Sequence, residues 1–267
     1  MSALARWDAF LAQIEGRAAT VRAEADAAAR WFIASVAGGG DYLPLSHQLS
    51  AVTSRLQELE KMIMDTWHAK VDDAICAEDP GQRERARDKG QALAHALDDA
   101  REELVIRSFA ELARQRFAHA LAATRTGACS RCGAACASPI SFRAIELACA
   151  CGARTPFEPG ELMRSVAAIG AHALAQEAAV VPWREMRAAE RRLHALRPPR
   201  ELAVIKEHER RQIAYWRSYL AERARFEPEL GRDPGLEIRS RMEPWYTTTA
   251  EHEEAWVRAG RPRDAIA

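Results

Sequence analysis

The sequence, 267 residues long, predicts a mainly α protein in which long antiparallel helices form a hairpin or bundle and a small β module is inserted between them. Two observations lead to this prediction. Apolar residues recur at spacings of three and four over long stretches, as they do on the buried face of a helix. Five of the six cysteines lie between residues 129 and 151, where this helical pattern stops.

The first helix is expected to extend from the N-terminus to the glycines at residues 38–40. Its apolar residues follow the three-four spacing of coiled coils, which predicts one stripe packed against a partner helix. The stripe consists of Leu4, Trp7, Leu11, Ile14, Ala18, Val21, Ala25, Ala28 and Phe32. The glycines are interpreted as a hinge or a helix stop, because no Lys-Ser or Lys-Thr pair follows them as it would in a phosphate-binding loop.

A second helix is expected from Ser46 to about Ala77, and a third from about Gln82 to about Thr124. The residues between them, 79–81, have the sequence Asp-Pro-Gly, which is a strong turn signal. Two long helices joined by a tight turn form an antiparallel hairpin, and the first helix can pack against it.

Prolines divide the rest of the chain into shorter helices. Pro182 is expected to bend or end one helix, and Pro198 and Pro199 to precede another. The end of the chain is expected to be irregular, because it is rich in proline, glycine and charged residues, although its aromatic residues suggest that parts of it dock against the rest of the protein. The predicted organisation is a helical bundle or hairpin at 1–126, a cysteine module at 127–158, C-terminal helices at 159–230 and an irregular tail at 231–267.

The cysteine module contains two closely spaced pairs. Cys129 and Cys132 have a C-x2-C spacing, and Cys149 and Cys151 have a C-x-C spacing. A glycine directly follows each pair, which lets the backbone turn so that amide N–H groups point at the sulfur atoms. Four thiolates around one zinc ion make the closed tetrahedral site of a structural metal.

At these residues the segment resembles a four-cysteine zinc ribbon, a module in which two cysteine knuckles on two hairpins hold one zinc ion. The resemblance covers residues 127–158. It implies one structural Zn²⁺ bound by Cys129, Cys132, Cys149 and Cys151. A segment of this length cannot build a sufficient core, so metal binding, worth about 10–16 kcal/mol, would hold it together.

The short spacing of the second pair leaves alternatives open. Cys136 is a possible ligand in place of Cys129 or Cys149, or a free thiol. Cys129, Cys132 and Cys136 also have the C-x2-C-x3-C spacing of an iron–sulfur site, and a set of buried cysteines without a metal is a further alternative. Zinc is favoured because glycine follows each pair. A redox-active C-x2-C pair needs a thioredoxin-like βαβ context, which is absent here.

Other residues of the module and its surroundings carry weaker signals. Alternating apolar residues at Ile140, Phe142 and Ala144 predict one strand of a hairpin. Cys76 is expected to be a small buried residue at the end of the second helix. Most of the scattered histidines are interpreted as surface residues on helices, and none is assigned a role.

An acidic cluster lies at the predicted hairpin tip and consists of Asp72, Asp73, Glu78 and Asp79. A helical hairpin with an acidic tip, followed by four cysteines and a further helix, is similar in element order to the DksA/TraR zinc-finger proteins. In that family the acidic tip enters the secondary channel of RNA polymerase. The resemblance therefore implies an RNA-polymerase-associated regulator as an alternative function.

The stretch 183–225 is rich in arginine and aromatic residues. Residues 182–226 contain 12 basic and 6 acidic side chains, although the whole chain has a formal net charge of zero. Basic and aromatic residues together can bind single-stranded nucleic acid. Glutamates alternate with these arginines at helical spacings, however, which favours ion pairs on a solvated helix face.

The leading hypothesis is a non-enzymatic interaction or assembly protein, with a protein partner or self-association through the first helix. The sequence contains no H-E-x-x-H, G-x-S-x-G, Walker or G-x-G-x-x-G motif, so we do not expect an enzyme. It also contains no secretion signal and no apolar stretch that could span a bilayer. We therefore expect a cytoplasmic protein with reduced cysteines and no membrane partner.

Overall fold

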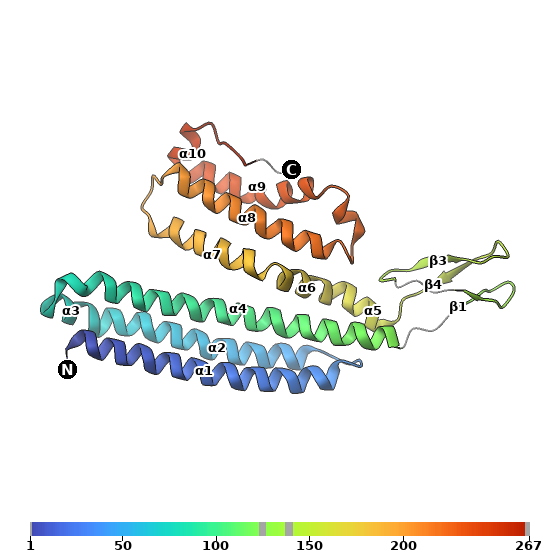
Figure 1. The fold of residues 1–267 in the computed structure, drawn as a ribbon, viewed down its shortest axis with the longest axis horizontal. Coiled ribbons are helices and arrows are strands. Elements are labelled where there is room, and N and C mark those ends of the chain that lie inside the picture. Colours follow the sequence, from blue (N-terminus) through green and yellow to red (C-terminus); the bar gives the residue numbers. More distant parts are fainter. Residues whose placement is uncertain (1, 123–126, 137–140, 265–267) are drawn as a thin grey trace. The chain divides into compact units, whose positions relative to one another are not determined.

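The structure, a computed structural model, describes residues 2–122, 127–136 and 141–264. The chain divides into two compact units, residues 1–115 and 116–267 (Figure 1). The predicted mainly α fold is confirmed, with two small antiparallel strand pairs among long helices. Within the described ranges, no helix combines the length and the apolar character needed to cross a membrane.

The N-terminal unit is built from three long helices that lie side by side in Figure 1. They are α1 (Ala3–Val36), α2 (Leu43–Thr66) and α4 (Arg83–Ala122), the last of which extends beyond the unit. All three contribute apolar side chains to one core. The predicted hairpin with the first helix packed against it is therefore confirmed.

Between α2 and α4 the chain continues through a π-helical turn, η1 (Trp67–Val71), and the short helix α3 (Asp72–Glu78), followed by the 3-10 turn η2 (Pro80–Gln82). The π-helical turn explains the spacing of the buried residues Ile63, Trp67, Val71 and Ile75, which are all four apart. Such a run would drift around an α-helix, but the wider i→i+5 turn keeps it on one face.

The stripe predicted for α1 is buried over most of its length, with a shift near its end. Ala29 and Ile33 are buried there, in place of the predicted Ala28 and Phe32. A straight helix has 3.6 residues per turn, so a strict 3.5-residue pattern drifts away from the core over a helix this long. Because the stripe is covered by the other helices of the unit, it is not a free surface for self-association.

Trp7 anchors the packing of α1 against α4. Its side chain is buried, and its indole Nε1–H donates a hydrogen bond of 2.9 Å to the carbonyl oxygen of Ala86. Gly90 lies one helical turn farther along α4, and a Cβ atom there would lie 2.6 Å from Cζ2 of Trp7. The indole therefore occupies space that only glycine leaves open.

Three of the four acidic residues at the hairpin tip have structural partners. Asp72 accepts two hydrogen bonds from the Arg83 guanidinium, at 2.6 and 2.8 Å. Glu78 accepts a hydrogen bond from the Ala3 amide at 2.6 Å, and Asp79 caps the 3-10 turn η2. Cys76, in contrast, is exposed, so the expectation that it is buried was wrong.

After the cysteine segment, the C-terminal unit continues as a series of shorter helices. In order they are α5 (Glu161–Ser165), the π-helical turn η3 (Val166–Gly170), α6 (Ala171–Ala178), α7 (Val180–Ala195), α8 (Leu202–Arg223), the 3-10 turn η4 (Pro228–Gly231), α9 (Pro234–His252) and α10 (Glu254–Arg258). The helices from α6 to α10 share one core, in which Ile205, Leu220, Met242 and Trp256 are almost completely buried.

Residues 231–267 were expected to be irregular, and this expectation was wrong because they contain α9 and α10. Pro234 stands in the first turn of α9, where a proline lacks no required hydrogen bond, and the Asp233 side chain caps that turn. Tyr246 and Trp256 are buried and attach this segment to α8. The gain from burying these aromatic side chains outweighs the low helix propensity of the prolines and glycines.

Two adjacent polar residues of α8, His208 and Glu209, are buried in this core. Trp245 donates its indole N–H to His208 Nδ1 at 3.2 Å, and Gln212 lies 3.2 Å from Nε2. Burial lowers the pKa of His208 to about 4, against a smaller opposing effect of the Glu190 carboxylate. The imidazole is therefore neutral at neutral pH, unlike the surface histidine expected from the sequence.

Gly90→Ala is expected to destabilise the N-terminal unit by about 1–3 kcal/mol, because the new methyl group overlaps the Trp7 indole. Gly16→Ala is the matched control, since Gly16 lies on the exposed face of α1 with nothing within 4 Å. Replacing that glycine should stabilise the protein by about 0.5–1 kcal/mol. Urea unfolding of both variants measures the difference, and a stabilising Gly90→Ala would contradict the packing described for Trp7.

His208 should make stability depend on pH. Its pKa is lower in the folded state (about 4) than in the unfolded chain (6.5), so its contribution is fully present above pH 6.5 and is lost as the pH falls toward 4. The loss should be at most about 3 kcal/mol. His208→Gln keeps an acceptor for Trp245 and should flatten the pH dependence of stability in unfolding experiments. His47→Gln, on the exposed surface, is the control and should not change that dependence. Equal pH profiles for wild type and His208→Gln would contradict the role given to His208.

Candidate metal centre

Two short antiparallel hairpins carry the cysteine pairs (Figure 1). The strands are β1 (Gly127–Ala128) with β2 (Ala135–Cys136), and β3 (Ile145–Ala148) with β4 (Arg154–Phe157). The loop of the first hairpin holds Cys129 and Cys132, and the loop of the second holds Cys149 and Cys151. This placement is the arrangement expected for a zinc ribbon.

The strand predicted from the alternation at Ile140, Phe142 and Ala144 is wrong for the described residues 141–144, because β3 begins only at Ile145. Ile140 lies outside the described residues. The Ser141 hydroxyl donates to the Arg143 carbonyl at 2.7 Å and accepts from the Arg143 amide at 3.2 Å. These local bonds offer the backbone an alternative to strand pairing.

The four predicted cysteines converge in the structure. The Sγ atoms of Cys129 and Cys151 are 3.6 Å apart, and those of Cys132 and Cys149 are 3.7 Å apart. All four Sγ atoms lie within 4.8 Å of one another. A tetrahedral zinc ion with Zn–S bonds of about 2.3 Å requires S···S distances of about 3.8 Å. The sulfur atoms are therefore close to the geometry that such an ion requires.

The two glycines close the knuckles, one with a tighter turn than the other. The Gly133 amide donates to the carbonyl oxygen of Cys129, four residues earlier, and the Gly152 amide donates to that of Cys149, three residues earlier; both bonds are 2.9 Å long. Both glycines have positive φ angles, +71° and +81°, which other residues rarely adopt. The shorter C-x-C spacing is thus accommodated by a turn that is one residue shorter.

Cys136 lies outside the group of four. It is buried in the small core of the ribbon together with Cys129 and Leu147, and burial raises the pKa of its thiol. Cys149, and not its alternative Cys136, is therefore a member of the group of four. The same geometry gives no support to an iron–sulfur site formed by Cys129, Cys132 and Cys136.

The sulfur atoms differ in their electrostatic surroundings. The backbone N–H groups of Cys132 and Arg131 point at the sulfur of Cys129 and lower its pKa to about 6. The Ala153 amide acts on Cys151 in the same direction, but the neighbouring sulfurs of Cys129, Cys149 and Cys132 raise its pKa to about 11. Thiolates at these distances repel one another, and a bound divalent cation would relieve that repulsion.

The apolar core of the ribbon is small. Among its described residues, Cys129, Cys136 and Leu147 are buried, and a few partly buried apolar side chains pack against them. The two hairpins are linked by the Ser130 amide, which donates to Thr155 Oγ1 at 3.2 Å. So small a core supports the expectation that a metal ion is needed for stability.

The segment between the two hairpins contacts helices of the same unit. The Phe142 ring stacks on Phe117 of α4, with 5.9 Å between ring centroids, and packs at 4.9 Å against Phe226. Arg143 forms an ion pair with Glu229. The ribbon is therefore attached to its unit through this segment.

The basic stretch 183–225 is largely occupied by internal ion pairs. Arg211 contacts Glu207 at 2.8 Å and Glu185 at 2.6 Å, and Arg223 contacts Glu227 at 2.5 Å. Pairs on this stretch also engage Arg187, Arg200, Lys206, Arg210 and Arg225. The helix-spaced pairing expected from the sequence is present, and it leaves fewer cations for phosphate groups.

Comparisons with known protein families, with curated proteins and with solved structures found no match to this chain.

Cys132→Ser is expected to abolish stoichiometric zinc binding, because it removes one of four converging sulfur atoms. Cys136→Ser is the matched control and should retain about one zinc ion per chain, since Cys136 lies outside the cluster. Elemental analysis of the purified proteins measures both. Equal metal content in the two variants, or metal loss only in Cys136→Ser, would refute the assignment of the ligands.

Proposed function

We propose that this chain is a non-enzymatic interaction or assembly protein in which one structural Zn²⁺ stiffens a ribbon that serves as a contact module. The ligands are Cys129, Cys132, Cys149 and Cys151. The observation that carries the proposal is the convergence of their Sγ atoms at distances of 3.6 and 3.7 Å from two separate hairpins.

The donor set supports a structural role for the metal. Four thiolates complete a tetrahedral shell and leave no position for water or substrate, whereas catalytic zinc sites keep one position open. Such a set suits zinc or iron, and the glycine-closed knuckles favour zinc. Within the described residues, no histidine or carboxylate joins the group.

The surface of the ribbon supports a contact role. Arg131 lies in the first knuckle and Arg154 follows the second, and both side chains are exposed. Arg154 pairs with the exposed Glu146, a contact worth little in water. A metal that fixes two loops removes the entropy cost of ordering them on binding, which is how a small module gains affinity.

The alternative function, a nucleic-acid or RNA-polymerase-associated regulator, gains no specific support. Asp72, Glu78 and Asp79 at the hairpin tip are used in local contacts. The arginines of 183–225 are mostly paired with carboxylates. We retain this function as the alternative that experiment must distinguish from a contact role.

We propose a reducing compartment, the cytoplasm, for the protein, because thiolates persist there as metal ligands.

The double variant Arg131→Ala/Arg154→Ala is expected to lose a protein partner while keeping its zinc, because neither side chain is a ligand. Arg22→Ala/Arg30→Ala on the exposed face of α1 is the matched control, with the same change in charge. Tagged full-length proteins are used to recover partners from native extract, with mass spectrometry and elemental analysis of each sample. A monodisperse wild-type monomer without partners, or equal recovery by the ribbon variant, would refute the contact role; salt-sensitive binding of nucleic acid would support the alternative.

A further inference from the structure

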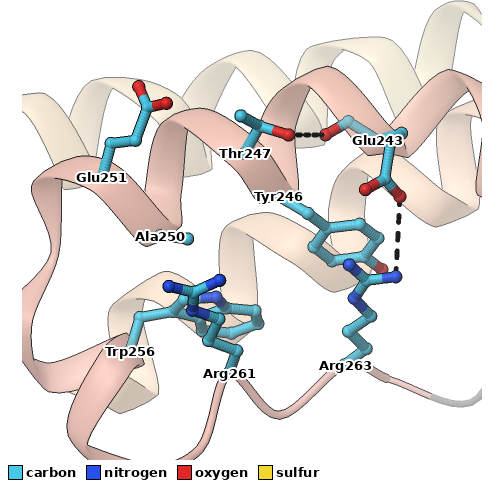
Figure 2. A pocket seen from close by; sticks show the side chains of 8 residues that line it. All are labelled: Glu243, Tyr246, Thr247, Ala250, Glu251, Trp256, Arg261 and Arg263. Carbon is cyan, nitrogen blue, oxygen red and sulfur yellow. Dashed lines mark hydrogen bonds and ion pairs between the residues drawn. The ribbon is translucent and has the colours of Figure 1, made fainter.

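A pocket of about 260 Å³ lies between α9 and the segment that follows α10 (Figure 2). Two arginines of that segment, Arg261 and Arg263, line it opposite Thr247 and Ala250 of α9. The rings of Tyr246 and Trp256 form its base; both residues are buried, and their rings are nearly parallel at 12°. The pocket belongs to the C-terminal unit and is separate from the cysteine cluster.

Arg261 has a backbone conformation that the end of the helix does not require. The Gly260 amide donates to the Val257 carbonyl and the Arg261 amide to the Trp256 carbonyl, which are the two bonds of a Schellman motif. That motif requires a positive φ only at Gly260, yet Arg261 also has a φ of +52°. Pro262 follows directly, and a residue before proline normally prefers an extended conformation. Non-glycine residues held in this way concentrate at ligand-binding sites.

Two charged residues of α8, the partly buried Lys206 and the buried Glu209, hold the strained segment in place. Lys206 contacts the Pro262 carbonyl at 3.3 Å and the Asp264 carboxylate at 2.6 Å. The Asp264 amide donates at 2.8 Å to Glu209, which is itself completely buried. The backbone on the C-terminal side of the arginines is therefore fixed to the core, which keeps the backbone of both arginines beside the pocket.

The two arginines differ in their partners. Arg263 lies 4.2 Å above the Tyr246 ring and 3.5 Å from the Glu243 carboxylate, an exposed pair that a ligand can displace at little cost. Figure 2 shows Arg261 beside Trp256. In the part of the chain that the structure describes, no carboxylate pairs with the Arg261 guanidinium.

We propose that this pocket binds a small organic carboxylate, with its anionic group on Arg261 and Arg263 and its apolar part against Ala250 and Thr247. A guanidinium matches a carboxylate with two parallel hydrogen bonds. Glu243 and Glu251 also line the pocket, and their negative charge disfavours a phosphate dianion relative to a carboxylate. The volume lies below the range of about 300–1,000 Å³ typical of drug-sized ligands, so the ligand is small.

Isothermal titration of the full-length protein with acetate, benzoate and succinate tests the proposal, with benzamide as the uncharged counterpart of benzoate. At least one of the three carboxylates should bind. If benzoate binds, benzamide should bind at least about tenfold more weakly. Inorganic phosphate should compete poorly. Absence of binding by all three carboxylates at millimolar concentration, or tighter binding of phosphate, would overturn the proposal.

Arg261→Gly removes the guanidinium but keeps the backbone conformation, because glycine adopts the positive φ without strain. This variant should unfold at a higher temperature than wild type and yet lose carboxylate binding at least about tenfold. Arg258→Ala, on the exposed face of α10 and outside the pocket, is the control and should bind as wild type does. Unchanged binding by Arg261→Gly would overturn the assignment.

Discussion

The cysteine module depends on one constraint: four sulfur atoms lie close together in a module that has only a small apolar core. The three residues that are buried in the described part of the module, two of them cysteines, cannot offset the conformational entropy of two hairpins. The amide groups that point at Cys129 favour a thiolate there, but the neighbouring sulfurs disfavour further ionisation at Cys151. A divalent cation would resolve both problems, because it would replace repulsion between thiolates by bonds that cross-link the two hairpins.

The helical core and the four converging cysteines could be predicted from the sequence because both are local patterns. A stripe such as Leu11, Ile14 and Ala18 specifies one face of a helix whatever covers it, and a glycine after each cysteine pair specifies a knuckle. The sequence also placed Cys149 within reach of the site, but it could not exclude Cys136. That distinction depends on a turn one residue shorter at Gly152, which only the backbone geometry of the second loop reveals.

The features that the sequence did not predict depend on contacts between distant residues. His208 resembles a surface histidine until Trp245 of α9 covers it, and α9 itself was hidden by its prolines and glycines. The strand expected around Phe142 was replaced by a segment in which Ser141 bonds to the backbone and the ring packs against Phe117 and Phe226. In each case the packing of an aromatic side chain against distant residues outweighed the local propensity.

The attachment of the ribbon gives the proposed metal a role beyond local folding. The segment containing Phe142 and Arg143 lies between the two cysteine pairs in sequence, and it is held by aromatic packing and by the ion pair with Glu229. If a metal ion joined the two knuckles, the anchoring at Phe142 would limit the orientation of both hairpins together. Such an ion would also join the loop that carries Arg131 to the loop that Arg154 follows, which is the property that the proposed contact module requires.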